Sequence, residues 1–394
     1  MQPCPLQKNL SKMRIPFVFK FMKWLVKLSF WFMKLVFRII GSLPAFRFLS
    51  SSKKTDEGVR FNGKVITDKN FVVLNKQFAK DLTTAYYKSG AFGVADVATF
   101  EAVDDHYAKD KTKVYYCNEY RDGRNLYLTK HQTILELKNA DPETFSSIKN
   151  GFAKDHKKAW FHDREFKVQD VSSLVSINNN FARDNVHAYL NLLPVANSNG
   201  KTFELLEHNF AKDVANIYYY GYTGEGQHDI CILPCNRNSF QILDYRYSKD
   251  DSAVFFLAFK IKGAHAPTFQ ILKQDYSKDK NSVYFQERKI SGADPLSFEV
   301  YKENEEFGHD FNYAKDRNSV FMDDKRVAEA DVNTFKVLGE NYGSDGRFVF
   351  YKDKLVKKAD PASFVVYPHD FGNADSEDVN NKFHEGMKIV SRKS

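Results

Sequence analysis

The sequence predicts a mainly β protein, built from tandem repeats of about 29 residues that stack in a solenoid-like array behind an N-terminal amphipathic or membrane helix. Three observations predict this fold class. A short motif that pairs an aromatic residue with Lys-Asp recurs along most of the chain, and its copies are regularly spaced. A dense apolar stretch, interrupted only by basic residues, lies ahead of the first copy.

Each repeat contains three recognisable parts. The first is an aromatic residue followed by a small residue, Lys or Arg, and Asp. The second is a β-branched and aromatic run, such as Val283-Tyr284-Phe285. The third is Ala-Asp-Pro-x-Ser/Thr-Phe, clearest at residues 140–145, 293–298 and 359–364. The first part begins at Phe78, Tyr107, Phe152, Phe181, Phe210, Tyr247, Tyr276 and Tyr313. A further copy begins at Tyr342 but has Ser344 in place of the basic residue.

The spacing of the copies predicts β-hairpins of variable length. Successive copies begin 29, 45, 29, 29, 37, 29, 37 and 29 residues apart, so the longer intervals exceed the basic one by 8 or 16. Because side chains alternate faces along a strand, an even insertion keeps every later residue on its correct face. The insertions at 114–137 and 218–233 carry Gly-containing turn signals, which indicates extended hairpins. A third insertion, at 302–311, is rich in glutamate.

The parts of the repeat have simple mechanical interpretations. The Asp carboxylate can accept hydrogen bonds from backbone N–H groups just ahead of it and so close a turn. Asp-Pro-x-Ser/Thr favours a single helical turn with Asp as its cap. These features predict about three short strands and one capped turn per repeat. A propeller blade would need four strands and a longer period, so a stacked array is favoured.

The repeat resembles a known family. The runs Asp279-Lys280-Asn281-Ser282-Val283-Tyr284-Phe285 and Asp110-Lys111-Thr112-Lys113-Val114-Tyr115-Tyr116 are similar to the motif after which the bacterial DKNYY repeat family is named. The resemblance covers residues 59–371 and implies a repeat protein associated with the bacterial cell envelope. It implies no activity and no catalytic residues.

The positive charge of the chain is concentrated at its N-terminus. The net charge is +8, but residues 1–54 contain eleven Lys and Arg and no Asp or Glu, which leaves 47 basic and 50 acidic residues elsewhere. The repeats are therefore close to neutral and lack the basic surface that a nucleic-acid partner would require, so no nucleic-acid partner is expected. The charge of the chain indicates a partner that binds the N-terminal segment.

That partner is predicted to be a membrane with anionic lipids. Residues 17–40 contain no Pro or Gly, and their basic residues form one stripe on a helix whose remaining surface is apolar. Three interpretations stay open for the helix at 15–49: one lying in the membrane interface, one spanning the bilayer, and a cap docked on the repeats. The residues expected at the membrane surface are Lys20, Lys23, Trp24, Lys27, Trp31, Lys34 and Arg38.

The expected order along the chain is a basic polar tail (1–14), the helix (15–49), a linker (50–58), the repeat array (59–375) and a polar C-terminal tail (376–394). The array is expected to begin and end on half repeats, since atypical end units cap a stack.

The sequence contains no P-loop, no GxGxxG motif after a strand, no GxSxG motif and no HExxH motif. The eleven histidines are scattered, and one aspartate per repeat offers too few oxygen ligands for calcium. We therefore expect no catalytic, cofactor or metal site, and expect a membrane-associated binding or scaffolding module, with a protein partner on the repeats. The alternative is an enzyme or effector whose site lies in the extended hairpins.

Overall fold

A computed structural model describes residues 59–389, except 95, 122, 124–126, 223–227, 274, 302–311 and 368–373. The predicted tail at 1–14, helix at 15–49 and linker at 50–58 lie outside the described residues, as does the insertion at 302–311. The helix and the role of that insertion therefore stay predictions.

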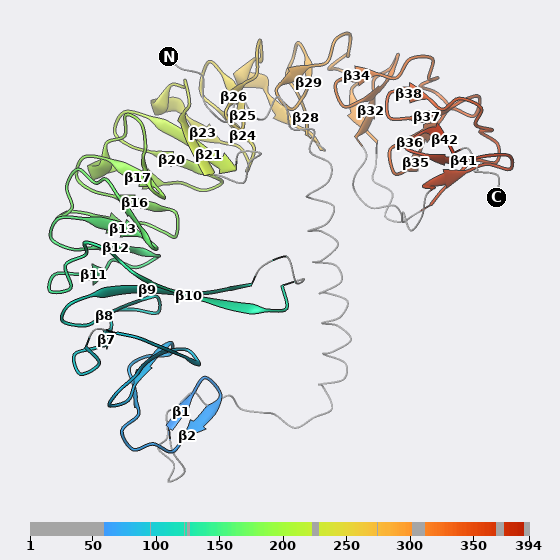
Figure 1. Cartoon of the computed structure of the whole chain (residues 1–394). Coiled ribbons are helices and arrows are strands. Elements are labelled where there is room, and N and C mark those ends of the chain that lie inside the picture. Colours follow the sequence, from blue (N-terminus) through green and yellow to red (C-terminus); the bar gives the residue numbers. More distant parts are fainter. Residues whose placement is uncertain are drawn as a thin grey trace, which may run out of the picture. The chain divides into compact units, whose positions relative to one another are not determined.

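The described chain forms small antiparallel sheets, one after another in sequence order (Figure 1). It comprises one two-stranded sheet and ten four-stranded sheets. Within each sheet, strands that follow one another in the sequence are hydrogen-bonded neighbours. The sheets fall into two compact units, the first reaching Ile232 and the second beginning at Leu233, with residues 207–209 also in the second. The prediction of a mainly β, tandem-repeat protein is confirmed. That residues 59–375 form a single array stays a prediction.

The strands of unit 1 are β1(Val59–Phe61), β2(Lys64–Ile66), β3(Val72–Val73), β4(Phe78–Lys80), β5(Ala85–Tyr87), β6(Gly90–Phe92), β7(Glu101–Ala102), β8(Tyr107–Lys109), β9(Val114–Arg121), β10(Lys130–Glu136), β11(Ser146–Ser147), β12(Phe152–Lys154), β13(Ala159–Phe161), β14(Arg164–Phe166), β15(Val175–Ser176), β16(Phe181–Arg183), β17(Ala188–Leu190), β18(Leu193–Pro194), β19(Glu204–Leu205), β20(Phe210–Lys212), β21(Ile217–Tyr222) and β22(His228–Ile232). A 3₁₀ turn, η2(Gly200–Thr202), precedes β19.

The strands of unit 2 are β23(Gln241–Ile242), β24(Tyr247–Lys249), β25(Val254–Phe256), β26(Phe259–Lys260), β27(Gln270–Ile271), β28(Tyr276–Lys278), β29(Val283–Phe285), β30(Arg288–Lys289), β31(Glu299–Val300), β32(Tyr313–Lys315), β33(Val320–Met322), β34(Lys325–Arg326), β35(Lys336–Gly339), β36(Tyr342–Ser344), β37(Val349–Tyr351), β38(Lys354–Leu355), β39(Val365–Val366), β40(Ser376–Glu377), β41(Lys382–His384) and β42(Met387–Lys388). The 3₁₀ turns η3(Arg237–Ser239) and η4(Ala266–Thr268) lie before β23 and β27.

The prediction of three strands per repeat was wrong, because each full repeat has a fourth. In one example β13 pairs with β14 through a two-residue turn, His162-Asp163, and His162 has a φ of 56°. Most of these turns lack the Asn-Gly signal that marks such a hairpin in a sequence. The left-handed backbone is instead adopted by residues of many kinds, so the fourth strand had no consistent marker.

The small residue of the motif is needed for contact between neighbouring sheets. Ala153 of β12 is fully buried in a cluster with Phe145 and Trp160, whereas Phe152 packs in the next cluster, with Ala182 and other residues. The two residues face opposite sides of one sheet, so successive sheets share apolar clusters. At the equivalent Gly343, an added Cβ would lie 2.2 Å from the ring of Phe335, so the position has no room for a larger side chain.

The two ends of the array differ from each other. The predicted half repeat at the start is confirmed: β1 and β2 form a two-stranded hairpin closed by Asn62-Gly63, both with positive φ. The predicted half repeat and polar tail at the C-terminal end were wrong. Strands β39–β42 complete a four-stranded sheet that extends through Lys388. Asp375 stands where other repeats have their first aromatic residue, and this hid the last copy.

Candidate functional site

The aspartate of the repeated motif holds two turns at once. Oδ1 of Asp213 accepts hydrogen bonds from the backbone N–H groups of Ala215 (2.8 Å) and Asn216 (2.7 Å), which closes the turn between β20 and β21. Oδ2 accepts the N–H of Asn199 (2.8 Å), in the turn before the sheet, and the hydroxyl of Tyr218 (2.7 Å). Equivalent backbone contacts to both turns recur at Asp110, Asp155, Asp184, Asp250, Asp279, Asp316, Asp345 and Asp378.

These hydrogen bonds favour the ionised carboxylate. Burial by itself would raise the pKa of Asp110, but hydrogen bonds from Thr112, Tyr115 and the N–H of Asp96 outweigh burial and lower the pKa to about 2. Burial and hydrogen bonding oppose each other in the same way at Asp213 and Asp279, and the pKa of each is lowered. The predicted role of the aspartates as turn caps is confirmed. The contact with a second turn was not predicted.

The basic residue before the aspartate holds the turn that follows its own sheet. Nζ of Lys154 donates hydrogen bonds to the carbonyl oxygens of Val171 (3.0 Å), Ser172 (2.8 Å) and Leu174 (3.1 Å). Similar contacts to carbonyls of the following turn are made by Lys80, Lys109, Arg183, Lys249 and Lys278. Turns between sheets are thus held by a cation from the preceding sheet and a carboxylate from the following sheet.

These contacts give the recurring polar residues a structural role. Each capping carboxylate accepts hydrogen bonds from backbone N–H groups, as Asp213 does. Among the residues that the structure describes, no group of three or more His, Cys, Asp or Glu side chains is arranged to hold a metal ion.

The first two insertions form extended hairpins, as predicted. Strands β9 and β10 pair over seven residue positions, from Glu136 opposite Tyr115 to Lys130 opposite Arg121, and they reach well past the other strands of their sheet (Figure 1). Strands β21 and β22 also pair beyond the length of a standard repeat. The two hairpins pack alike near their bases, because Cys117 and Ile134 of the first and the equivalent Tyr220 and Ile230 of the second lie in or against apolar clusters shared with the preceding sheet.

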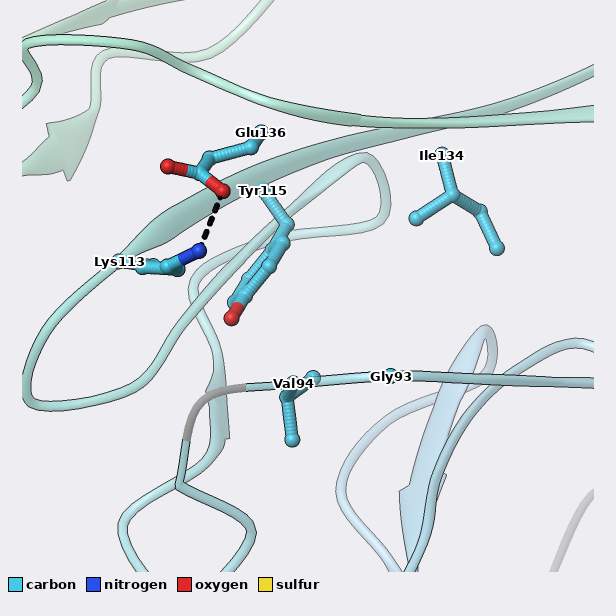
Figure 2. Close-up of a pocket in the computed structure, with 6 residues that line it drawn as sticks. All are labelled: Gly93, Val94, Lys113, Tyr115, Ile134 and Glu136. Atoms are coloured by element: carbon cyan, nitrogen blue, oxygen red, sulfur yellow. Dashed lines mark hydrogen bonds and ion pairs between the residues drawn. The ribbon is translucent and has the colours of Figure 1, made fainter.

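A pocket of about 330 Å³ lies at the base of the β9–β10 hairpin. Its lining comprises Gly93, Val94, Lys113, Tyr115, Ile134 and Glu136. The backbone at Gly93 and Val94 lies across the pocket from Ile134 and Glu136, and Tyr115 lies between (Figure 2).

The chemistry of the pocket is that of one ion pair beside apolar groups. Nζ of Lys113 lies 2.6 Å from Oε2 of Glu136, and both side chains are partly exposed. Tyr115 donates its hydroxyl to Asp110, a turn-capping carboxylate. An equivalent pair, Lys158–Glu165, occurs at 3.0 Å in the next sheet, so the ion pair belongs to the repeat framework. Sequence reasoning missed the pocket, although Tyr115, Ile134 and Glu136 all fall within the first predicted insertion.

The predicted membrane-surface residues, Lys20, Lys23, Trp24, Lys27, Trp31, Lys34 and Arg38, lie outside the described residues. In the part of the chain that is described, no helix has the length and apolar character needed to cross a bilayer. The structure therefore does not bring these residues to any site, and their role stays a prediction.

The sheets and the contacts that hold their turns define a class of protein, the tandem β-repeat proteins. The model of the DKNYY family matches residues 32–119, 120–258 and 247–386, and the chain belongs to this family. The three matches cover nearly all the repeats, which confirms the resemblance drawn from the motif. A search of curated proteins and a search of solved structures each returned no match.

Proposed function

We propose that this protein is a membrane-associated module of the bacterial cell envelope that binds or organises a protein partner on its repeats. In this proposal its sheets stack as a solenoid-like array, and a helix over residues 15–49 attaches the array to anionic lipid. The catalytic, cofactor and metal classes have no support in the described residues beyond the pocket considered below.

The observation that carries the proposal is that the motif residues and the insertions have separate roles. The motif residues hold turns, as Asp213 and Lys154 do, and they leave no recurring reactive group. The insertions are not needed for this framework, and the β9–β10 hairpin extends beyond it. A rigid scaffold with variable projecting segments is the usual arrangement of a binding protein.

Shared apolar clusters support a stacked array inside each unit. Phe152 packs in one cluster with Tyr189 of the next sheet, and Tyr276 packs in one cluster with Phe321 of the next. Repeats of a solenoid bury their faces against immediate neighbours in this way.

Membrane attachment rests on the basic stripe and apolar remainder of residues 17–40. Each Lys near an anionic leaflet contributes about 1 kcal/mol, which salt screens, whereas the apolar contribution is not screened. Vesicle sedimentation of the full chain tests this proposal, with Lys20, Lys23, Lys27 and Lys34 changed to Gln. We expect the variant to bind less at low salt and the unmodified chain to loosen at high salt or alkaline pH.

Two outcomes would change this proposal. Resistance to both washes, with release only by detergent, would replace the interfacial helix with a spanning one. Equal sedimentation of the full chain and a chain beginning at Ser50, both at background level, would assign residues 15–49 to a cap on the array.

The second candidate is an enzyme or effector with its site in an extended hairpin, and the pocket beside β9–β10 favours it. An added Cβ at Gly93 would meet no atom within 4 Å, so a side chain can enter the pocket there. A thermal-shift screen of small polar ligands tests this candidate, with Gly93→Leu as the filled control. Stabilisation of the parent and not of the variant would support it, and equal shifts would reject it.

A further inference from the structure

The fourth strands of unit 2 carry basic residues at one recurring position. This position pairs with the middle residue of the third strand, and it is basic in four of the five sheets of the unit. The four residues are Lys260, Lys289, Arg326 and Lys388, which lie opposite Phe255, Tyr284, Phe321 and Phe383. We call these four basic residues the cationic row. All four are exposed, and each lies on a strand at the edge of its sheet.

The cationic row follows the stack of sheets. Tyr284, Phe321 and Phe383, the rings opposite three of its members, are buried in the apolar clusters that join each sheet to the preceding one. Because directly opposite residues share one face of a sheet, the cations lie on the matching side of successive sheets. Packed sheets lie about 10 Å apart, so the cations recur at about that interval. In the one sheet where Leu355 takes this position, the neighbouring Lys354 is exposed.

The charges of the cationic row are not compensated within the protein. Among the residues that the structure describes, no carboxylate forms an ion pair with any of the four. Acidic residues in the adjoining turns pair with other cations instead, Asp324 with Arg288 at 3.2 Å and Asp353 with Lys325 at 3.5 Å. The row therefore presents four uncompensated positive charges to an anion in solution.

Unit 1 has the same edge strands without these cations. Lysine on an edge strand can prevent pairing with another chain, which would be a sufficient role for a single basic residue. The equivalent positions in unit 1 are Val65, Ala91, Glu136, Glu165, Pro194 and Ile232, and none of them is basic. Since these strands also lie at the edges of their sheets, edge protection alone does not require the cationic row.

We propose that the cationic row binds a linear polyanion, which lies along the stack of sheets in unit 2. One cation per sheet places the charges in a line, and this matches an extended chain with anionic groups along its length. Three of the four residues are lysines, whose point charge requires no fixed ligand geometry, so phosphate and carboxylate polymers both fit. A single-stranded nucleic acid fits less well, because its bases stack on aromatic side chains and no aromatic side chain is exposed in these five strands. The inference adds a partner to the proposed binding role and does not depend on membrane attachment.

The test uses the full chain in a non-ionic detergent, with inorganic polyphosphate and alginate as the phosphate and carboxylate probes. Every protein in the test carries Lys20, Lys23, Lys27 and Lys34 changed to Gln, so that the basic N-terminal segment contributes less to binding. The row variant adds Lys260→Gln, Lys289→Gln, Arg326→Gln and Lys388→Gln. The matched control instead adds Lys157→Gln, Lys273→Gln, Lys280→Gln and Lys336→Gln, which removes the same charge from exposed positions outside the fourth strands.

We expect the row variant to bind at least one polymer roughly ten-fold more weakly, since each exposed ion pair contributes roughly a two-fold factor. The control should bind nearly as the parent does, and salt should weaken the parent more than the row variant. Bound polymer should also protect Lys260, Lys289 and Lys388 from acetylation, measured by mass spectrometry, more than it protects the control lysines. Loss with polyphosphate alone would assign a phosphate polymer, and loss with alginate alone a carboxylate polymer.

Three outcomes would overturn the inference. Equal losses in the row variant and the control would show general attraction between charges. Self-association of the row variant, with unchanged polymer affinity of the unassociated chain, would leave the row as edge protection only. Protection of the row lysines by anionic vesicles and not by either polymer would assign the row to lipid. Unchanged thermal unfolding of both variants shows that any loss is one of binding.

Discussion

The two compact units differ in the identity of one buried aromatic residue, the first residue of the repeated motif. The first aromatic residue of the motif is Phe at four of five positions in unit 1, namely Phe78, Phe152, Phe181 and Phe210, with Tyr107 as the exception. In unit 2 it is Tyr247, Tyr276, Tyr313 and Tyr342, and the last repeat has Asp375 at this position. The rings occupy equivalent places in the core, so the difference concerns a single hydroxyl group.

In unit 2 this hydroxyl joins each sheet to the next. Tyr313 donates to the carbonyl oxygens of Asn341 (2.9 Å) and Lys352 (2.8 Å), both at the ends of strands in the following sheet. Tyr247 makes the same kind of contact with Asp275, at 2.9 Å. Tyr107 of unit 1 does so with Gly151 and His162. A polar link between sheets therefore accompanies the apolar contact wherever Tyr is present.

The turn of the following sheet explains the choice between Phe and Tyr. After Phe152 that turn contains Leu192, which packs against the apolar cluster around Phe152. After Tyr313 the equivalent residue is Asp353, and after Tyr107 it is Asp163. Where the following sheet has a two-residue turn, an apolar turn thus accompanies Phe152 and Phe210 and a polar turn accompanies each Tyr, whereas Phe78 and Phe181 are followed by the extended hairpins. Neighbouring sheets of unit 1 are held together mainly by apolar packing. Those of unit 2 are held together by apolar packing and by hydrogen bonds from the tyrosine hydroxyl groups.

The largest expected effect is one that both units should share. Asp279→Ala removes hydrogen bonds to the N–H groups of His265, Asn281 and Ser282 and to the hydroxyl of Tyr284, at a residue only 4% exposed. We expect a loss of about 2–4 kcal/mol, combining a lost cap with buried donors left unpaired. Denaturant unfolding and hydrogen exchange of β28 and β29 would measure it.

Asp213→Ala is the matched variant in unit 1, and it should cost a similar amount. A much smaller loss in one unit would show that the caps are not equivalent. Calcium should leave the melting temperature of the parent unchanged, and a calcium-dependent rise would assign the carboxylates to a metal site instead.

The next effect should distinguish the units. Tyr313→Phe keeps the ring and removes the hydroxyl, leaving two carbonyl oxygens without this donor. We expect a loss of about 1–2 kcal/mol, the cost of a buried hydrogen bond, measured as faster exchange of amides in β32 and β36. No change would show that the hydroxyl contributes nothing to the stability of unit 2.

The reverse substitution tests the explanation from the turn. Phe152→Tyr places a hydroxyl where Leu192 packs, so it should destabilise unit 1 by about 1–3 kcal/mol through overpacking. Adding Leu192→Asp should recover part of this loss by restoring the polar turn found after Tyr313. A stabilising effect of Phe152→Tyr alone would contradict the proposed link between ring and turn.

These contacts show how far the sequence could lead. Motif and spacing predicted the repeats, the long hairpins and the capping role of the aspartates, because each depends on neighbours within a few residues. The Phe and Tyr pattern was readable, yet its cause lies in a carbonyl about 28 residues away, as between Tyr247 and Asp275. The last sheet was missed because Asp375 replaces the ring and accepts a hydrogen bond from Tyr342 instead. The pocket at Gly93 depends on how two sheets meet, which no local pattern records.

A pH-dependent effect should appear in unit 1 near neutrality. His162 occupies the tight turn after β13, where unit 2 has Leu257, Gln286, Asp323, Lys352 or Glu385. The ring of His162 is partly exposed, but packing against Tyr116 and Phe161 partly removes it from water, and this desolvation, together with the charge of His106, lowers its pKa from the ordinary value near 6.5. The folded state then binds fewer protons than the unfolded state, so the stability that neutral His162 allows is lost as pH falls below about 6.5.

Unfolding of unit 1 between pH 7 and 5, followed by hydrogen exchange of β12 and β13, measures this loss. His162→Asn keeps the left-handed turn and should remove the pH dependence. Both units should weaken further as pH falls from about 4 towards 2, because the caps with lowered pKa values, such as Asp110, then become protonated. If the stability of unit 1 in the unmodified chain stays constant from pH 7 to 5, protonation of His162 does not affect the stability of the fold.

The smallest effect concerns ion pairs between neighbouring turns at the surface of unit 2. Nζ of Lys325 lies 3.5 Å from a carboxylate oxygen of Asp353, and the lysine side chain is 63% exposed. Such pairs gain little in water and lose side-chain entropy, so Lys325→Ala should change stability by at most about 0.5 kcal/mol. Lys158→Ala, which breaks the pair with Glu165 in unit 1, should behave alike. Denaturant midpoints at low and high salt measure both changes. A loss as large as that of Tyr313→Phe would mean that surface charge, and not the buried hydroxyl, is the main stabilising difference between the units.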